Sequence, residues 1–143
     1  MKVKFKLLND KATLPAYSRV GDACLDLRSC ENAVVKAKSF ATVGTGVACE
    51  IPKGWELQIR ARSGLSAKNG IGLVNGVATI DENYRGELKL ILFNFSDTDF
   101  KIEVGDRVAQ ICFFKTTKIT PQITSQLSET NRGAGGLGSS GIK

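Results

Sequence analysis

Short apolar segments recur at regular intervals along the chain, and this recurrence constrains the fold more than any other feature. Apolar and polar residues alternate through residues 2–8, 55–60 and 100–104, and turn signals such as Pro52-Lys53-Gly54 separate such segments. Alternation places successive side chains on opposite faces of an extended strand. Since almost no window has helical periodicity, the sequence predicts an all-β fold, a distorted β-barrel or jelly roll of short strands.

One short segment, Ser63 to Asn69, is expected to be helical, with Gly70 as its C-terminal stop. A helix that opens on Ser63 directly after Arg62 offers free backbone N–H groups, a hydroxyl and a guanidinium, which together suit a phosphate. The alternative is that Ser63 is only an N-cap and Arg62 is solvated.

The stretch Leu73 to Leu92 predicts a β-hairpin that turns at residues 81–83. A turn does not require a carboxylate directly after a buried isoleucine, nor an exposed tyrosine followed by Arg-Gly. Asp81, Tyr84 and Arg85 are therefore candidates for chemistry. The alternative is that Asp81 only makes an Asx-type turn while Tyr84 packs on its neighbours.

Histidine is absent from the chain, which excludes a Ser-His-Asp or Cys-His mechanism in its usual form. Any general base must be a carboxylate, a lysine, or a perturbed tyrosine or cysteine. The four cysteines, at positions 24, 30, 49 and 112, form no C-x-x-C pair. We therefore expect buried free thiols instead of zinc ligands or disulfides.

The formal net charge of +6 is spread thinly, with no block of like charge and interleaved aromatic residues. This pattern argues weakly for a polyanionic ligand and against nucleic acid as a partner. The start of the chain is not a basic and apolar leader, and no apolar run could cross a bilayer, so we expect no membrane partner and a cytoplasmic location. A nuclear location would equally suit a eukaryotic or viral protein.

Three further stretches contain polar residues or glycines that suggest a structural or binding role. Gln110 interrupts the apolar segment 108–114, and an unpaired buried amide costs about 1–3 kcal/mol, so it requires backbone groups or a ligand. Asp26 and Arg28 share a face of a predicted strand, where a surface charge pair is the plainer interpretation. Residues 128–143 form a glycine-rich, flexible end after a domain of residues 1–127, yet such a segment can cradle phosphates and act as a lid.

Together these stretches resemble the five motifs of the homotrimeric dUTP pyrophosphatases, the dUTPases, in order and spacing over essentially the whole chain. The motif residues are 23–27, 62–65, 75–86, 105–110 and 132–141. The resemblance implies a jelly roll that assembles as a homotrimer, in which the tail of one subunit closes a site formed by the other two. It also implies hydrolysis of dUTP to dUMP and pyrophosphate with Mg²⁺, by attack of water on the α-phosphorus.

The resemblance also implies residue roles. Asp81 matches the carboxylate that orients and deprotonates the attacking water, and Tyr84 matches the ring that packs on the deoxyribose. Asn75, with the backbone beside Gly76 and Val77, matches the segment that reads the uracil edge.

Other motif positions match groups that contact phosphate. Arg62, Ser63 and Gln110 match phosphate ligands, with Gly64 giving close backbone approach, and Asp26 supports the phosphate and metal region through water. The tail residues expected to bind substrate are Arg132, Leu137, Gly138, Ser139 and Ser140.

Three positions depart from the family pattern: Leu137 replaces a usual Phe, Cys24 a usual Gly and Ala61 a usual Pro. Two alternatives stay open at this point. A dCTP deaminase of the same fold would need a differently placed glutamate, and it lacks the Ile80-Asp-x-x-Tyr84 pattern. A non-catalytic relative would usually have lost Asp81 or Arg132, and both are present.

Overall fold

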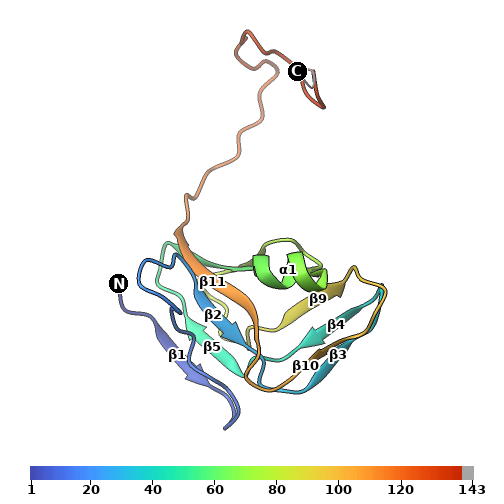
Figure 1. Ribbon diagram of the computed structural model, residues 1–143. Coiled ribbons are helices and arrows are strands. Elements are labelled where there is room, and N and C mark those ends of the chain that lie inside the picture. The colour runs from blue at the N-terminus through green and yellow to red at the C-terminus, as the bar shows by residue number, and fades with distance from the viewer. Residues whose placement is uncertain (140–143) are drawn as a thin grey trace.

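The computed structural model describes residues 1–139, and it shows a body of strands with one helix in this part of the chain (Figure 1). The elements are β1 (Lys4–Leu7), β2 (Leu25–Arg28), β3 (Ala33–Val35), β4 (Phe40–Val43), β5 (Val47–Glu50), β6 (Trp55–Arg60), α1 (Ser63–Asn69), β7 (Ile71–Leu73), β8 (Ala78–Ile80), β9 (Leu90–Asn94), β10 (Phe100–Ile102) and β11 (Arg107–Lys115).

Every strand pair within residues 1–139 is antiparallel. One sheet has the order β2-β11-β6-β8, a second has the order β4-β9-β7, and the pairs β1-β5 and β10-β3 complete the body. These sheets do not close into one continuous barrel. The expected all-β class with a single short helix is confirmed.

The core is built by the alternation that the sequence shows. In β6, Leu57 and Ile59 are fully buried, while Glu56, Gln58 and Arg60 on the other face are half-buried. Side chains from β2, β9, β10 and β11 pack on the same cluster. The cysteines are free thiols, as expected: three are buried and Cys24 is partly exposed.

The predicted hairpin between residues 73 and 92 is confirmed at its ends, which pair with each other, and is wrong in between, where β8 pairs with β6. Ile80 in β8 lies opposite Leu57 in β6, whereas Leu92 in β9 lies opposite Leu73 in β7. Gly76, at φ 65°, turns the chain after β7, so the apolar run that reads as one strand is two strands in different sheets. Residues 81–89 therefore cross from one sheet to another.

Helix α1 has the predicted bounds. Gly70 ends it in the left-handed conformation at φ 66°, where its N–H donates to Ser66 O at 3.1 Å. Arg62 is the extended residue before the helix and makes no side-chain cap hydrogen bond, so the alternative that Ser63 is the N-cap is wrong.

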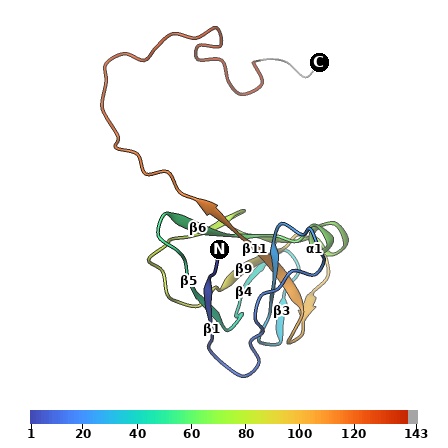
Figure 2. The ribbon, with the colours of Figure 1, turned by 90° about the vertical axis from the view of Figure 1, so that its left-hand side faces the viewer.

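After β11 the chain leaves the body as a long extended tail (Figures 1 and 2). Thr116 N donates to Gly54 O, and within the described part of the chain the hydrogen bonds of residues 117–139 lie inside the tail. The division at residue 127 stays a prediction. Within the described chain, no helix has the length and apolar character needed to cross a membrane.

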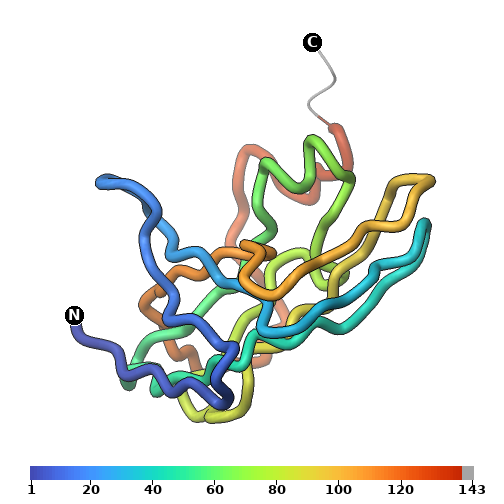
Figure 3. The backbone as a smooth tube through the Cα atoms, turned by 60° about the horizontal axis from the view of Figure 1, so that its bottom comes forward, coloured from blue at the N-terminus to red at the C-terminus, as the bar shows by residue number. Residues whose placement is uncertain are grey.

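The β3–β4 and β9–β10 turns project together from one end of the body (Figure 3). Asn94, fully buried, joins them: its Nδ2 donates to Val35 O at 2.9 Å and to Thr98 O at 2.8 Å. Its Oδ1 accepts from Ser96 N at 2.9 Å and from Ser96 Oγ at 2.7 Å. One side chain thus satisfies polar groups from two separate turns.

Changing Asn94 to Ala should lower the free energy of unfolding by about 2–3 kcal/mol, because the buried carbonyl of Val35 loses its side-chain donor. Urea unfolding at fixed protein concentration measures this difference. The exposed Asn83→Ala variant is the control and should unfold at the parental urea concentration. Equal midpoints for both variants would contradict the role given to Asn94.

Candidate active site

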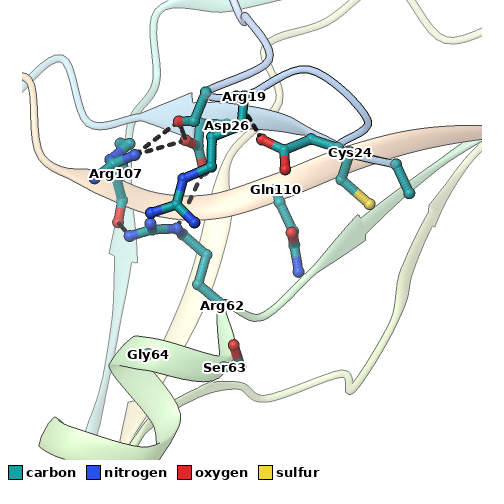
Figure 4. A pocket seen from close by; sticks show the side chains of 11 residues that line it. Arg19, Cys24, Asp26, Arg62, Ser63, Gly64, Arg107 and Gln110 are labelled. Carbon is teal, nitrogen blue, oxygen red and sulfur yellow. Dashed lines mark hydrogen bonds and ion pairs between the residues drawn. The ribbon is translucent and has the colours of Figure 1, made fainter.

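A polar cavity of about 410 Å³ lies where the start of α1 meets β2 and β11 (Figure 4). The lining residues are Ser18, Arg19, Asp22, Ala23, Cys24, Asp26, Arg62, Ser63, Gly64, Arg107 and Gln110.

Asp26 organises the charges of this cavity. Its Oδ1 lies 3.1 Å from Arg62 Nε, and its Oδ2 lies 3.1 Å from Arg107 Nη1 and accepts a hydrogen bond from Ser18 Oγ. The plainer interpretation, a pair between Asp26 and Arg28, is wrong, since Arg28 Nη1 donates to Gly105 O. Two arginines from distant parts of the chain therefore converge on one carboxylate.

Burial of Asp26 alone would raise the pKa of its carboxyl group. The hydrogen bonds from Ser18 and Arg107 and the positive charges of Arg62 and Arg107 outweigh burial, and they hold the pKa below its ordinary value of 3.8. The carboxylate is thus ionised at neutral pH and keeps both guanidinium groups at the mouth of the cavity.

The start of α1 supplies further donors. Ser66 N donates to Arg62 O, the first helical hydrogen bond, so the three preceding N–H groups have no partner within the helix. Ser63 and Gly64 line the cavity here, and a Cβ added to Gly64 would meet no atom within 4 Å. Gln110 faces the same space, and its Nε2 donates to Ala61 O at 2.9 Å, which is the backbone partner that its position required.

The residues expected to read the base and the sugar lie elsewhere. Asn75, Gly76 and Val77 form the exposed turn between β7 and β8, and Asp81 is exposed directly after β8. Tyr84 is 44% exposed. None of these residues lines the cavity around Asp26.

Tyr84 and Arg85 are fixed by their own loop. The hydroxyl of Tyr84 donates to Glu87 O at 3.0 Å, and its ring lies where a Cβ on Gly86 would be. Arg85 Nη1 donates to Glu82 O at 2.7 Å and to Tyr84 O at 2.8 Å. Arg85 therefore holds the loop together within this chain.

Strand order explains why the two groups of residues do not meet. Asp26 lies on β2 and Asp81 follows β8, and these are the opposite edges of the sheet β2-β11-β6-β8. Three strand spacings amount to about 14 Å across the sheet. Along the strand direction, Ile80 lies level with Phe113 of β11, whereas Asp26 lies level with Gln110. These two positions of β11 are three residues apart, which separates the two groups by about a further 10 Å.

The tail residues form a third group, away from both others (Figure 2). Arg132 Nε donates to Gly135 O at 2.8 Å, and Ser139 N donates to Gly136 O at 3.0 Å. Leu137 and Gly138 adopt φ 49° and 86°, and the Leu137 side chain is fully exposed. Ser140 lies outside the described residues.

The sequence of this chain is similar to those of known dUTPases along its whole length. The dUTPase family model matches residues 10–141 of the chain. The deoxyuridine 5'-triphosphate nucleotidohydrolase of Clostridium acetobutylicum is 43% identical over 143 residues, covering 100% of this chain and 99% of the relative. The chain belongs to the dUTPase family. The enzyme of the same name from Nautilia profundicola is 44% identical over 141 residues and covers 99% of both chains.

Solved dUTPase structures have the same fold. The dUTPase of Staphylococcus bacteriophage 80alpha, in complex with dUPNHPP, superposes with a TM-score of 0.91 at 26% identity and covers 99% of both chains. A point mutant of the dUTPase from phage phi11 of S. aureus has a TM-score of 0.81 at 22% identity, covering 88% of this chain and 98% of the phage chain. That phage structure describes the coordination of a structural Mg(II) ion.

The dUTPases are metal-dependent, and the donors of this chain fit an ion held mainly by phosphates. Within residues 1–139, no cluster of three or more His, Cys, Asp or Glu residues is placed to hold a metal. Both oxygens of Asp26 already face arginines, so a direct bond from Asp26 would displace one of them.

Sequence reasoning gave no role to Arg107 and Ser18, although both bind Asp26. Arg107 falls within a dUTPase motif and starts a strand, a signal that pointed to it. Ser18 lies in a polar loop with no periodicity, and nothing in the sequence distinguishes it from its neighbours.

Asp26 should make the stability of this dUTPase depend on acid pH. Its folded pKa is lower than its unfolded value, so its contribution is fully present above pH 3.8 and is lost as pH falls through the folded pKa. The difference in free energy of unfolding between the parent and Asp26→Asn should therefore be largest near neutral pH and shrink below pH 3.8. Urea unfolding across this pH range measures it.

Asp97→Asn is the control, because that side chain is 90% exposed on the β9–β10 turn and its ion pair with Lys38 is open to solvent and therefore weak. This variant should follow the parent at every pH. A constant difference between the parent and Asp26→Asn down to the lowest pH would contradict the lowered pKa.

Proposed function

We infer that this chain is a dUTP diphosphatase, which hydrolyses dUTP to dUMP and pyrophosphate. The reaction keeps uracil out of DNA and supplies dUMP for dTMP synthesis. Membership of the dUTPase family supports the activity. The observation that carries the residue-level proposal is the cavity in which two arginines and a helix start face a common polar space.

The cavity around Asp26 is proposed to bind the phosphates. A nucleoside triphosphate carries about four negative charges, and attack at phosphorus adds charge to the phosphoryl oxygens. Arg62 and Arg107 supply positive charge, while Ser63, Gln110 and the backbone at Gly64 supply neutral donors. When bound, Mg²⁺ would neutralise phosphate charge and polarise the phosphoryl group, with Asp26 in contact through water.

Asp81 is proposed as the general base that orients water and takes its proton. A carboxylate suits a chain without histidine. Asp81 is exposed in the single chain. A bound nucleotide and a neighbouring subunit would cover it.

Specificity is proposed to reside in the two exposed segments at the other edge of the sheet. Asn75 and the backbone of Gly76 and Val77 present donors and acceptors to the uracil edge, where cytosine would place like groups against each other. Tyr84 packs on the deoxyribose and leaves no space for a 2′-hydroxyl group.

A homotrimer with shared sites would unite these groups. Because one sheet keeps Asp26 and Asp81 at opposite edges, one chain cannot apply both to the same nucleotide. A second subunit would supply the missing group. The tail, with Arg132, Ser139 and Ser140 for the γ-phosphate, would come from a third subunit and close the site.

Asp81→Asn should lower pyrophosphate release from dUTP by about a thousandfold, because general-base catalysis is lost while the nucleotide still binds. The measurement compares dUTP with dCTP, dTTP and UTP for the parent, Asp81→Asn and the exposed control Asp97→Asn. The parent and the control should act on dUTP and release no ammonia from dCTP. Full activity of Asp81→Asn would exclude Asp81 as the base.

Complementation tests the shared site. Asp81→Asn and Arg62→Ala should each be inactive alone, because the first removes the general base from every site and the second removes a phosphate ligand from every site. Refolding the two variants together in equal amounts should restore about a quarter of the sites. In random assembly about half of the sites receive an intact Asp81, and about half of those also receive an intact Arg62 from another subunit. Unmixed samples refolded alone are the control. No recovery from co-refolded trimers would contradict a site shared between subunits.

A further inference from the structure

Residues 81–89 carry Asp81 and Tyr84 across from β8 to β9 without forming a strand of their own. Two glutamates fasten this crossing to the body. At its start, Glu82 Oε2 accepts a hydrogen bond from Gly54 N in the β5–β6 turn. At its end, Glu87 binds the segment between β4 and β5.

Glu87 accepts two backbone hydrogen bonds from the body. Its side chain is 22% exposed, and its Oε1 accepts from Thr45 N at 3.1 Å and from Gly46 N at 2.8 Å. Thr45 is fully buried, and its hydroxyl donates to Leu88 O at 2.9 Å. The carboxylate of Glu87 is thus joined to a part of the body that cannot shift without disturbing the core.

The same residue also holds Tyr84. The backbone carbonyl of Glu87 accepts the hydrogen bond from the Tyr84 hydroxyl at 3.0 Å, and the ring lies against Gly86. Across residues 1–139 this is the only hydrogen bond of the Tyr84 side chain. The ring is therefore fixed at its polar end through a single residue.

We propose that Glu87 is a positioning residue for sugar discrimination: it fixes the Tyr84 ring by joining its hydroxyl, through the Glu87 backbone, to the Thr45-Gly46 segment. The inference rests on the proposed role of Tyr84 in excluding a ribose. A ring rejects one extra hydroxyl only when it cannot move aside, because an aromatic ring that shifts slightly would make room for it. Glu87 prevents that shift.

Glu31 provides a matched control, because its carboxylate binds the same segment between β4 and β5. Glu31 Oε1 accepts from Gly44 N at 2.6 Å, next to the two N–H groups that Glu87 binds. A Cβ on Gly44 would lie 3.1 Å from Glu87 Oε1 and 3.2 Å from Glu31 Oε1, so the two carboxylates flank one residue. Glu31 is outside the crossing, and within the described residues it makes no hydrogen bond with Tyr84.

The experiment measures kcat/KM for dUTP and for UTP with the full chain, together with urea unfolding. Glu87→Ala should lower the dUTP/UTP ratio by about tenfold, because the freed ring admits the 2′-hydroxyl. Glu87→Gln should keep the parental dUTP/UTP ratio, since the amide oxygen of Gln can accept hydrogen bonds from both N–H groups. Glu31→Ala should lower stability and leave the ratio unchanged.

Tyr84→Phe removes only the hydroxyl and should lower the ratio in the same direction, which keeps the test valid if Glu87→Ala does not fold. An unchanged ratio in Tyr84→Phe or Glu87→Ala would overturn the inference, as would an equal loss in Glu31→Ala. Tyr84→Ala separates the two proposals: an unchanged ratio in that variant would instead reject the role of Tyr84 itself.

Discussion

The pairing of β11 with both β2 and β6 is the interaction on which the rest of the structure depends. Through β2 it sets Gln110 beside Asp26, and through β6 it sets Ile111 beside Ile59 in the core. The same strand begins with Arg107, which reaches Asp26. Apolar burial on one face of this strand thus fixes the polar geometry of the cavity on the other.

Local features of the fold could be predicted from the sequence, whereas strand partners could not. Residues 55–60 and 63–69 form the expected strand and helix, because alternation and a glycine stop are local signals. The predicted hairpin was wrong only for residues 78–80, which pair with β6, because a sequence pattern identifies a strand but not its partner. Gly76, whose positive φ turns the chain, was the signal against a single strand.

The candidate site shows the same limit. Recognisable motifs identified Asp26, Arg62 and Gln110, and the structure brings all three to one cavity. Ser18 was missed because its role depends on where an irregular loop lies against β2, which has no local sequence pattern. Motif spacing likewise cannot show that Asp81 lies across the sheet from Asp26, since that separation arises from strand order.

The placement of Asp26 and Asp81 on opposite sheet edges has a consequence for how activity arises in a cell. If sites are shared between subunits, as proposed above, a single copy would be folded but inactive. Turnover would begin only when copies become abundant enough to meet, so activity would rise more steeply than protein abundance. Under the same proposal, a defective copy would also inactivate sites that it forms together with intact copies.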